Sequence, residues 1–209
     1  RDGLSGEVEA ALGSAPEAAE TFVPILTRQV PEKAPDRTRA IAGIAMANAG
    51  GNRFIWRLEF GADYPKANSN VVFYLDADRN PKTGRQGHGC EVMLIVTEGA
   101  CSVSAFKPDG GSTVAPAPRA AIAGKFLYIS YDTDLPQQEG QSLVRLMVLS
   151  ETWNPHKGVD STGYISAKGP ALGTRAKTTL DSDITESIGM LQTYGPRTID
   201  PIVAAPENV

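Results

Sequence analysis

The fold of this chain is decided by a run of alternating residues, Phe54-Ile55-Trp56-Arg57-Leu58-Glu59-Phe60. A large apolar side chain stands at every second position, and charged side chains occupy two of the positions between them. A period of two residues is typical of a β-strand that buries one face and exposes the other. The stretch therefore predicts a half-buried strand with Trp56 in the core.

Short runs of similar character lie on both sides of this stretch. They are rich in β-branched and aromatic residues, and Gly, Pro, Asp and Asn separate them. Because no long helical pattern comes between them, we expect an all-β fold, an antiparallel β-sandwich of jelly-roll type. The expected strands cover residues 41–47, 54–60, 70–75, 91–96, 102–106, 126–131, 143–149 and 163–167.

The two ends of the chain differ from its middle. Ser14 and Glu17 have the spacing of a helix capping box, so we expect a short helix over residues 15–22, followed by an irregular or extended stretch that contains three prolines. After Gly173 the strand pattern stops. We expect three parts: an N-terminal helix and extended segment (1–39), the sandwich domain (40–172), and a C-terminal extension with a short helix and an irregular tail (173–209).

Composition argues against two classes of partner. The 209 residues include 20 basic and 24 acidic side chains, for a net charge of -4, so no strongly basic surface for nucleic acid is expected. No apolar run reaches the roughly 18 residues that a membrane span needs. The sequence opens with Arg1, and we therefore expect that a signal peptide has been removed or that the chain is a fragment.

The two cysteines, Cys90 and Cys101, have no metal or redox spacing. If residues 91–96 and 101–106 form a regular hairpin, Cys101 lies opposite Val96, and Cys90 lies about 17 Å further along. A disulfide requires Cα atoms within about 7 Å of each other. Pairing would therefore need a bulge or a different register.

The most informative stretch for function is Asp76-Ala77-Asp78-Arg79-Asn80-Pro81-Lys82-Thr83-Gly84, which follows an apolar strand. Oxygen-bearing side chains at alternate positions (Asp76, Asp78 and Asn80) have the spacing by which a loop wraps hard ligands around Ca²⁺. The loop is not an EF-hand, because Pro81 stands where that motif requires glycine. Calcium would need further oxygens from backbone carbonyls, Glu91 or a neighbouring loop. The alternative is a metal-free turn, since turns use the same residue types.

This strand and loop, continued through Gly87 and Gly89 to Glu91 and an apolar strand, resemble the DOMON-like and family 9 carbohydrate-binding-module sandwiches of secreted bacterial proteins. The resemblance covers residues 40–167. It implies a β-sandwich, sugar or haem binding in some members, and structural calcium in the carbohydrate-binding ones. An aromatic residue often follows the acidic one in these families, whereas this chain has Val92, and the sugar-binding pair of tryptophans has no clear counterpart.

A sugar site needs an exposed aromatic face beside polar groups. Trp153 lies in a polar loop that contains proline, and Tyr64 precedes Pro65 in another loop. These two residues are the candidates for ligand binding. The alternative role for each is that of an ordinary loop anchor.

These observations predict a non-catalytic, calcium-stabilised binding module of a secreted or periplasmic protein, whose partner is carbohydrate or another small ligand. Other domains of a larger protein are a further possible partner. Two alternatives stay open. The first is a polysaccharide-active hydrolase or lyase that uses Asp76 with Asp132 or Glu91. The second is a structural or assembly domain of an exported protein. Because the familiar nucleophile, zinc and phosphate-loop motifs are missing from the sequence, no catalytic residue is predicted.

Overall fold

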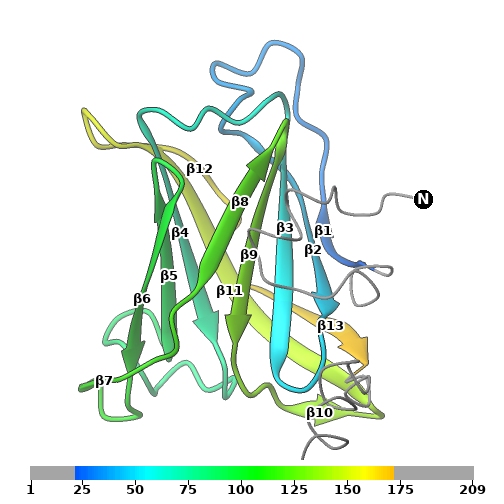
Figure 1. The fold of residues 1–209 in the computed structure, drawn as a ribbon, viewed down its shortest axis with the longest axis vertical. Coiled ribbons are helices and arrows are strands. Elements are labelled where there is room, and N and C mark those ends of the chain that lie inside the picture. The colour runs from blue at the N-terminus through cyan, green and yellow to red at the C-terminus, as the bar shows by residue number, and fades with distance from the viewer. Residues whose placement is uncertain (1–21, 172–209) are drawn as a thin grey trace, which may run out of the picture. The chain divides into compact units, whose positions relative to one another are not determined.

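The computed structural model describes residues 22–171, which form two antiparallel β-sheets packed together (Figure 1). The expected all-β sandwich is confirmed. The helix expected over residues 15–22 lies, apart from Phe22, outside the described residues, and so does the extension of residues 173–209. Within residues 22–171, no helix is long and apolar enough to cross a membrane.

One sheet has five strands in the order β1-β2-β3-β9-β8, and we call it the five-stranded sheet. Its members are β1 (Val23–Thr27), β2 (Ile41–Asn48), β3 (Arg53–Phe60), β9 (Phe126–Asp132) and β8 (Arg119–Ala123).

The other sheet has eight strands, and we call it the eight-stranded sheet. Its main path is β10-β11-β4-β5-β6-β7, and two further strands pair with β11. Its members are β10 (Gln137–Gln138), β11 (Gln141–Thr152), β4 (Ser69–Asp76), β5 (Val92–Thr97), β6 (Ala100–Phe106), β7 (Ser112–Thr113), β12 (Lys157–Ser161) and β13 (Ile165–Ala171).

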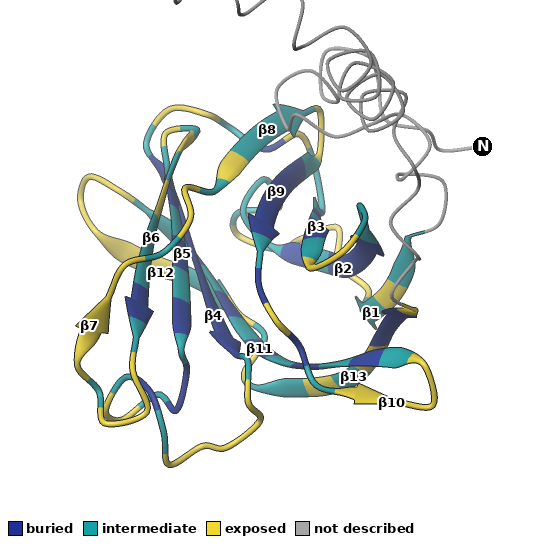
Figure 2. Ribbon diagram, turned by 60° about the horizontal axis from the view of Figure 1, so that its bottom comes forward, coloured by how far each residue is buried: buried dark blue, intermediate teal, exposed yellow. Residues whose placement is uncertain are grey.

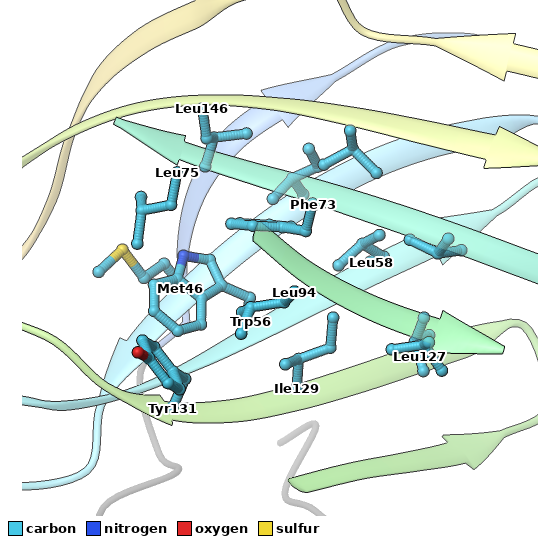
Figure 3. Packing of buried hydrophobic residues seen from close by; sticks show 14 of the residues in the cluster. Met46, Trp56, Leu58, Phe73, Leu75, Leu94, Leu127, Ile129, Tyr131 and Leu146 are labelled. Atoms are coloured by element: carbon cyan, nitrogen blue, oxygen red, sulfur yellow. The ribbon is translucent and has the colours of Figure 1, made fainter. Parts of the chain in front are cut away.

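The hydrophobic core lies between the two sheets (Figure 3). Trp56 of β3 is fully buried, as the alternation predicts, and its ring centroid lies 5.4 Å from that of Phe73 in β4. Strand β11 shows the same period of two, with Val144, Leu146 and Val148 pointing into the core. Figure 2 shows the buried residues concentrated in the central strands and the exposed residues in the connecting loops and in the short strands β7 and β10.

Strand β4 is buried on both faces, which the apolar run from Val71 to Leu75 reflects. Val71, Phe73 and Leu75 belong to the core between the sheets. Val72 and Tyr74 point to the outer face of the eight-stranded sheet. The ring of His88 stacks on Tyr74 with centroids 4.7 Å apart. The loop that follows β4 therefore folds back over the outer face.

The sequence did not predict β1, which pairs with β2 and adds a strand before residue 40. Pro24 lies within β1 and argued against a regular strand there. Because β1 is at the edge of its sheet, a residue without an N–H group can be accommodated in it, and the register shifts between Pro24 and Leu26.

The β5–β6 hairpin has the predicted register, with Val96 opposite Cys101. Its two turn residues, Glu98 and Gly99, have φ angles of 51° and 86°, which is the left-handed pair that tight hairpins require. Both cysteines are free. Burial raises the pKa of Cys90 to about 11 and that of Cys101 to about 12.

We expect Phe73→Ala to lower the free energy of unfolding by about 3–5 kcal/mol, because it empties a fully buried site between the sheets. Urea denaturation measures this change. The control is Val114→Ala, at a side chain that is 97% exposed, where the change should stay within about 0.5 kcal/mol. Similar effects of the two substitutions would contradict the placement of Phe73.

Candidate functional site

Strand pairing brings three residues of the candidate site, Arg145, Asp76 and Glu91, into one row across the sheet. Arg145 of β11 lies directly opposite Asp76, the last residue of β4. Val92, the first residue of β5, pairs with Leu75, so the preceding residue, Glu91, lies beside Asp76. All three side chains project on the outer face of the eight-stranded sheet, because they follow the alternation of Tyr74 and its neighbours.

The loop of residues 77–91 adds further oxygen atoms to this row. Glu91 Oε2 accepts a hydrogen bond from the Ala77 N–H at 2.8 Å, which fixes the start of the loop. The Thr83 hydroxyl lies 2.9 Å from Asp78 Oδ2, 3.1 Å from Glu91 Oε1 and 2.8 Å from the Asn80 carbonyl oxygen. A hydroxyl has a single proton and can donate to only one of these oxygens. Thr83 therefore lies among three oxygen atoms, of which its hydroxyl can satisfy one.

Asp76 is the buried member of the cluster, with an exposed fraction of 0%. Its Oδ2 accepts a hydrogen bond from Arg145 Nη1. Its Oδ1 is buried and has no hydrogen-bond partner among residues 22–171. Burial raises the pKa of Asp76 above its usual value, the Arg145 guanidinium counteracts this, and the nearby Asp78 carboxylate adds to the rise.

The residues present fit a hard cation. Asp76, Asp78 and Glu91 each offer a carboxylate oxygen, and these oxygens lie within 4.8 Å of one another. Calcium takes six to eight oxygen ligands of this type. A cation placed among them would provide the partner that Asp76 Oδ1 lacks. The buried, unpartnered oxygen of Asp76 is stronger support for a cation site than the presence of three acids is.

Of the four predicted metal ligands, the structure brings the three acids together and leaves the Asn80 side chain within the loop. The amide oxygen of Asn80 accepts a hydrogen bond from the Lys82 N–H at 3.1 Å. Thr83 and Arg145 were not predicted as site residues from the sequence. Thr83 could have been noticed as the next oxygen-bearing side chain of the motif, whereas Arg145 lies 69 residues from Asp76 and only the strand pairing reveals it.

The second Asp-x-Asp sequence, Asp132 to Asp134, lies at the end of β9 in the five-stranded sheet. Arg53 donates two hydrogen bonds to the Asp132 carboxylate, at 2.7 and 3.1 Å. These hydrogen bonds lower the pKa of Asp132. Asp132 is thus already neutralised by an arginine and does not join the acidic cluster.

The two predicted ligand-binding aromatics have different environments. Trp153 lies in the loop between β11 and β12 and is 49% exposed. Tyr64 is only 5% exposed, and its ring stacks on Phe60 with centroids 4.2 Å apart. Of the two, only Trp153 offers an accessible ring.

The Trp153 loop is held by contacts to neighbouring segments. The backbone N–H groups of Trp153 and Asn154 donate to the carbonyl and side-chain oxygens of Asn68, at 3.3 and 2.6 Å. His156 Nε2 lies 2.8 Å from Glu151 Oε2. Glu151 also lines a shallow hollow of about 280 Å³, formed with Leu149, Gly158, Val159, Asp160 and Ser161.

No model of a known protein family matches this chain, and no curated protein matches it. The resemblance to the DOMON-like and family 9 carbohydrate-binding-module sandwiches remains a prediction from the loop motif. The geometry of the cluster and of the Trp153 loop is the basis for the function proposed below.

Two glycines of the loop, Gly84 and Gly87, have a left-handed backbone conformation. Gly84 has a φ of +70°, and a Cβ atom there would lie 2.1 Å from the Cys90 carbonyl oxygen. Gly87 has a φ of +79°, but a Cβ atom there would meet nothing within 4 Å. The two positions share the backbone conformation and differ in the space around them.

We expect Gly84→Ala to destabilise the protein by about 2–4 kcal/mol, because it adds a clash to the backbone strain. The control is Gly87→Ala, where the strain alone should cost about 1 kcal/mol. Urea denaturation of both variants without metal measures the difference. Equal losses would show that the loop does not fold closely around Gly84.

Proposed function

We propose that this protein is a non-catalytic binding module that calcium stabilises, and that it works outside the cytoplasm with carbohydrate as its ligand. The observation that carries the calcium part is the Asp76 carboxylate, which is fully buried and has one oxygen without a partner in the described part of the chain. Leaving such an oxygen unpaired in the folded state is costly.

In this proposal Asp76, Asp78 and Glu91 hold the ion, together with oxygens of the loop around Thr83. Bound calcium supplies positive charge that offsets the repulsion among the three carboxylates. Asp76 ends β4, Glu91 precedes β5 and Asp78 belongs to the connecting loop. Residues that share one ion are fixed relative to one another, so the ion would order the whole connection.

The geometry favours this role over the alternative of glycoside hydrolysis. Hydrolases that use two carboxyl groups need both of them to face the sugar. Asp132, one of the acids considered for this role, is paired with Arg53 in the five-stranded sheet. Asp76 has no exposed surface from which to reach a glycan.

Carbohydrate is the favoured ligand because of the surroundings of Trp153. An exposed indole face can pack on the C–H groups of a sugar ring, and nearby polar side chains can bind its hydroxyls. The ring centroid of Trp153 lies 6.3 Å from that of His156. His156 contacts Glu151, which lines the hollow described above. Asn70 Nδ2 donates to Glu151 at 2.8 Å, which fixes that carboxylate.

A location outside the cytoplasm agrees with a partly exposed site of three carboxylates, because extracellular modules bind calcium at about 10⁻⁴–10⁻³ M. Cytosolic calcium sites must bind considerably more tightly. If no sugar binds, the remaining alternative is a structural or assembly role within an exported protein.

The calcium proposal predicts a rise in the melting temperature of about 5 °C when millimolar Ca²⁺ is added to EDTA-treated protein. Asp78→Asn should remove most of this rise and change the melting temperature little in EDTA. Differential scanning calorimetry in the two buffers measures both effects.

The matched control for Asp78→Asn is Asp134→Asn, at the equivalent position of the second Asp-x-Asp sequence. This variant should keep the full response to calcium. If calcium does not raise the melting temperature of the unaltered protein, or if Asp78→Asn is equally destabilised in both buffers, the calcium proposal is wrong.

For the ligand, we expect Trp153→Ala to reduce retention on a polysaccharide affinity gel by at least about tenfold, since stacked aromatic contacts dominate such binding. The melting temperature should change little, because the side chain is 49% exposed. Val114→Ala serves as the exposed control. Unchanged retention of Trp153→Ala on a gel that retains the unaltered protein would exclude Trp153 as the platform.

A further inference from the structure

Arg145 holds a positive charge beside the three carboxylates of the candidate site. Asp76, Asp78 and Glu91 carry three negative charges, and Arg145 carries one positive charge against Asp76. The formal charge of the group is therefore -2, equal and opposite to that of a divalent ion. We propose that Arg145 sets the valence preference of the site, matching it to divalent cations and weakening its binding of trivalent ones. This inference rests on the calcium site proposed above.

The position of Arg145 is fixed on several sides. Its Nη1 donates to Asp76 Oδ2 and lies 3.4 Å from the Gly89 carbonyl oxygen. Its guanidinium carbon lies 4.0 Å from the centroid of the Tyr164 ring. The Tyr164 hydroxyl donates to the His88 carbonyl oxygen, so the ring is itself held. These contacts hold the guanidinium beside Asp76.

The repulsion between Arg145 and a bound cation grows with the charge of the cation. The side chain of Arg145 is 19% exposed and that of Asp76 is 0% exposed, so water screens this repulsion incompletely. A trivalent ion gains more from the three carboxylates than a divalent ion does, but it also loses more to Arg145. Removing the charge should therefore favour trivalent ions more than divalent ones.

The basic residues of the loop of residues 77–91 are poorer candidates than Arg145 for setting the valence preference. Arg79 and Lys82 are exposed, so solvent and salt screen their charges. Arg85 is directed elsewhere, with its guanidinium carbon 5.8 Å from the centroid of the Tyr74 ring and Nη1 2.7 Å from Met93 Sδ. Arg79 is thus a matched control, because it has the same charge as Arg145 and follows Asp78 in the loop, but is exposed.

The test compares the dissociation constants of Ca²⁺ and Tb³⁺ by isothermal titration calorimetry, with Tb³⁺ luminescence as a second readout. Arg145→Gln should raise the preference for Tb³⁺ over Ca²⁺ by about tenfold or more relative to the unaltered protein. Arg145→Lys keeps the charge and should leave the preference close to that of the unaltered protein. Arg79→Gln should do the same.

An unchanged Tb³⁺ preference in Arg145→Gln, with Ca²⁺ binding by the unaltered protein intact, would overturn the inference and leave the calcium site standing. An increase of the same size in Arg79→Gln would also overturn it, since any loss of charge would then suffice. If the unaltered protein binds no Ca²⁺, the proposed function fails, and this inference fails with it.

A second comparison applies if Arg145→Gln does not fold. Asp76→Asn and the double variant Asp76→Asn/Arg145→Gln differ only at Arg145, and the double variant leaves no unpaired charge at the buried position. The double variant should prefer Tb³⁺ more strongly than Asp76→Asn does. Equal preferences would overturn the inference.

Discussion

The register between β4 and β11 is the constraint on which the core and the candidate site both depend. The same ladder that directs Phe73 and Val148 inward places Asp76 opposite Arg145 on the outer face. A shift of one residue would turn every side chain of β4 to the opposite face. Because Phe73 is fully buried between the sheets, such a shift would cost the core its central contact with Trp56. Apolar packing thus keeps the charged groups aligned.

Much of the fold could be predicted from the sequence because its central strands follow simple periods. The alternation around Trp56 and the turn at Gly99 each predicted an element correctly. The strands that escaped prediction lie at edges or are short and polar, such as β1 with Pro24 and β12 with Gly158. Those segments are strands because a neighbouring strand supplies their backbone hydrogen bonds. Their own residues give little indication of strand structure.

The candidate site was predictable to the extent that its residues are close in sequence. The spacing of Asp76, Asp78 and Asn80 predicted a common site, and Glu91 was one of several possible sources of further oxygens; the structure brings Asp76, Asp78 and Glu91 together. Arg145 comes from a strand much later in the chain, and a single arginine in an apolar strand has no distinctive pattern. Tyr64 was a candidate because it lies near a proline, but its ring packs on Phe60 in the core.

The two cysteines give the protein a pair of internal reporters of local opening. Cys90 belongs to the loop of residues 77–91 and is fully buried, and Cys101 lies in the β5–β6 hairpin. Because burial raises both pKa values, to about 11 and about 12, almost no reactive thiolate exists at neutral pH in the folded state. A thiol reagent can then modify Cys90 only during the moments when its surroundings separate. The rate of that modification would time the opening of the connection between β4 and β5, with no label added to the chain.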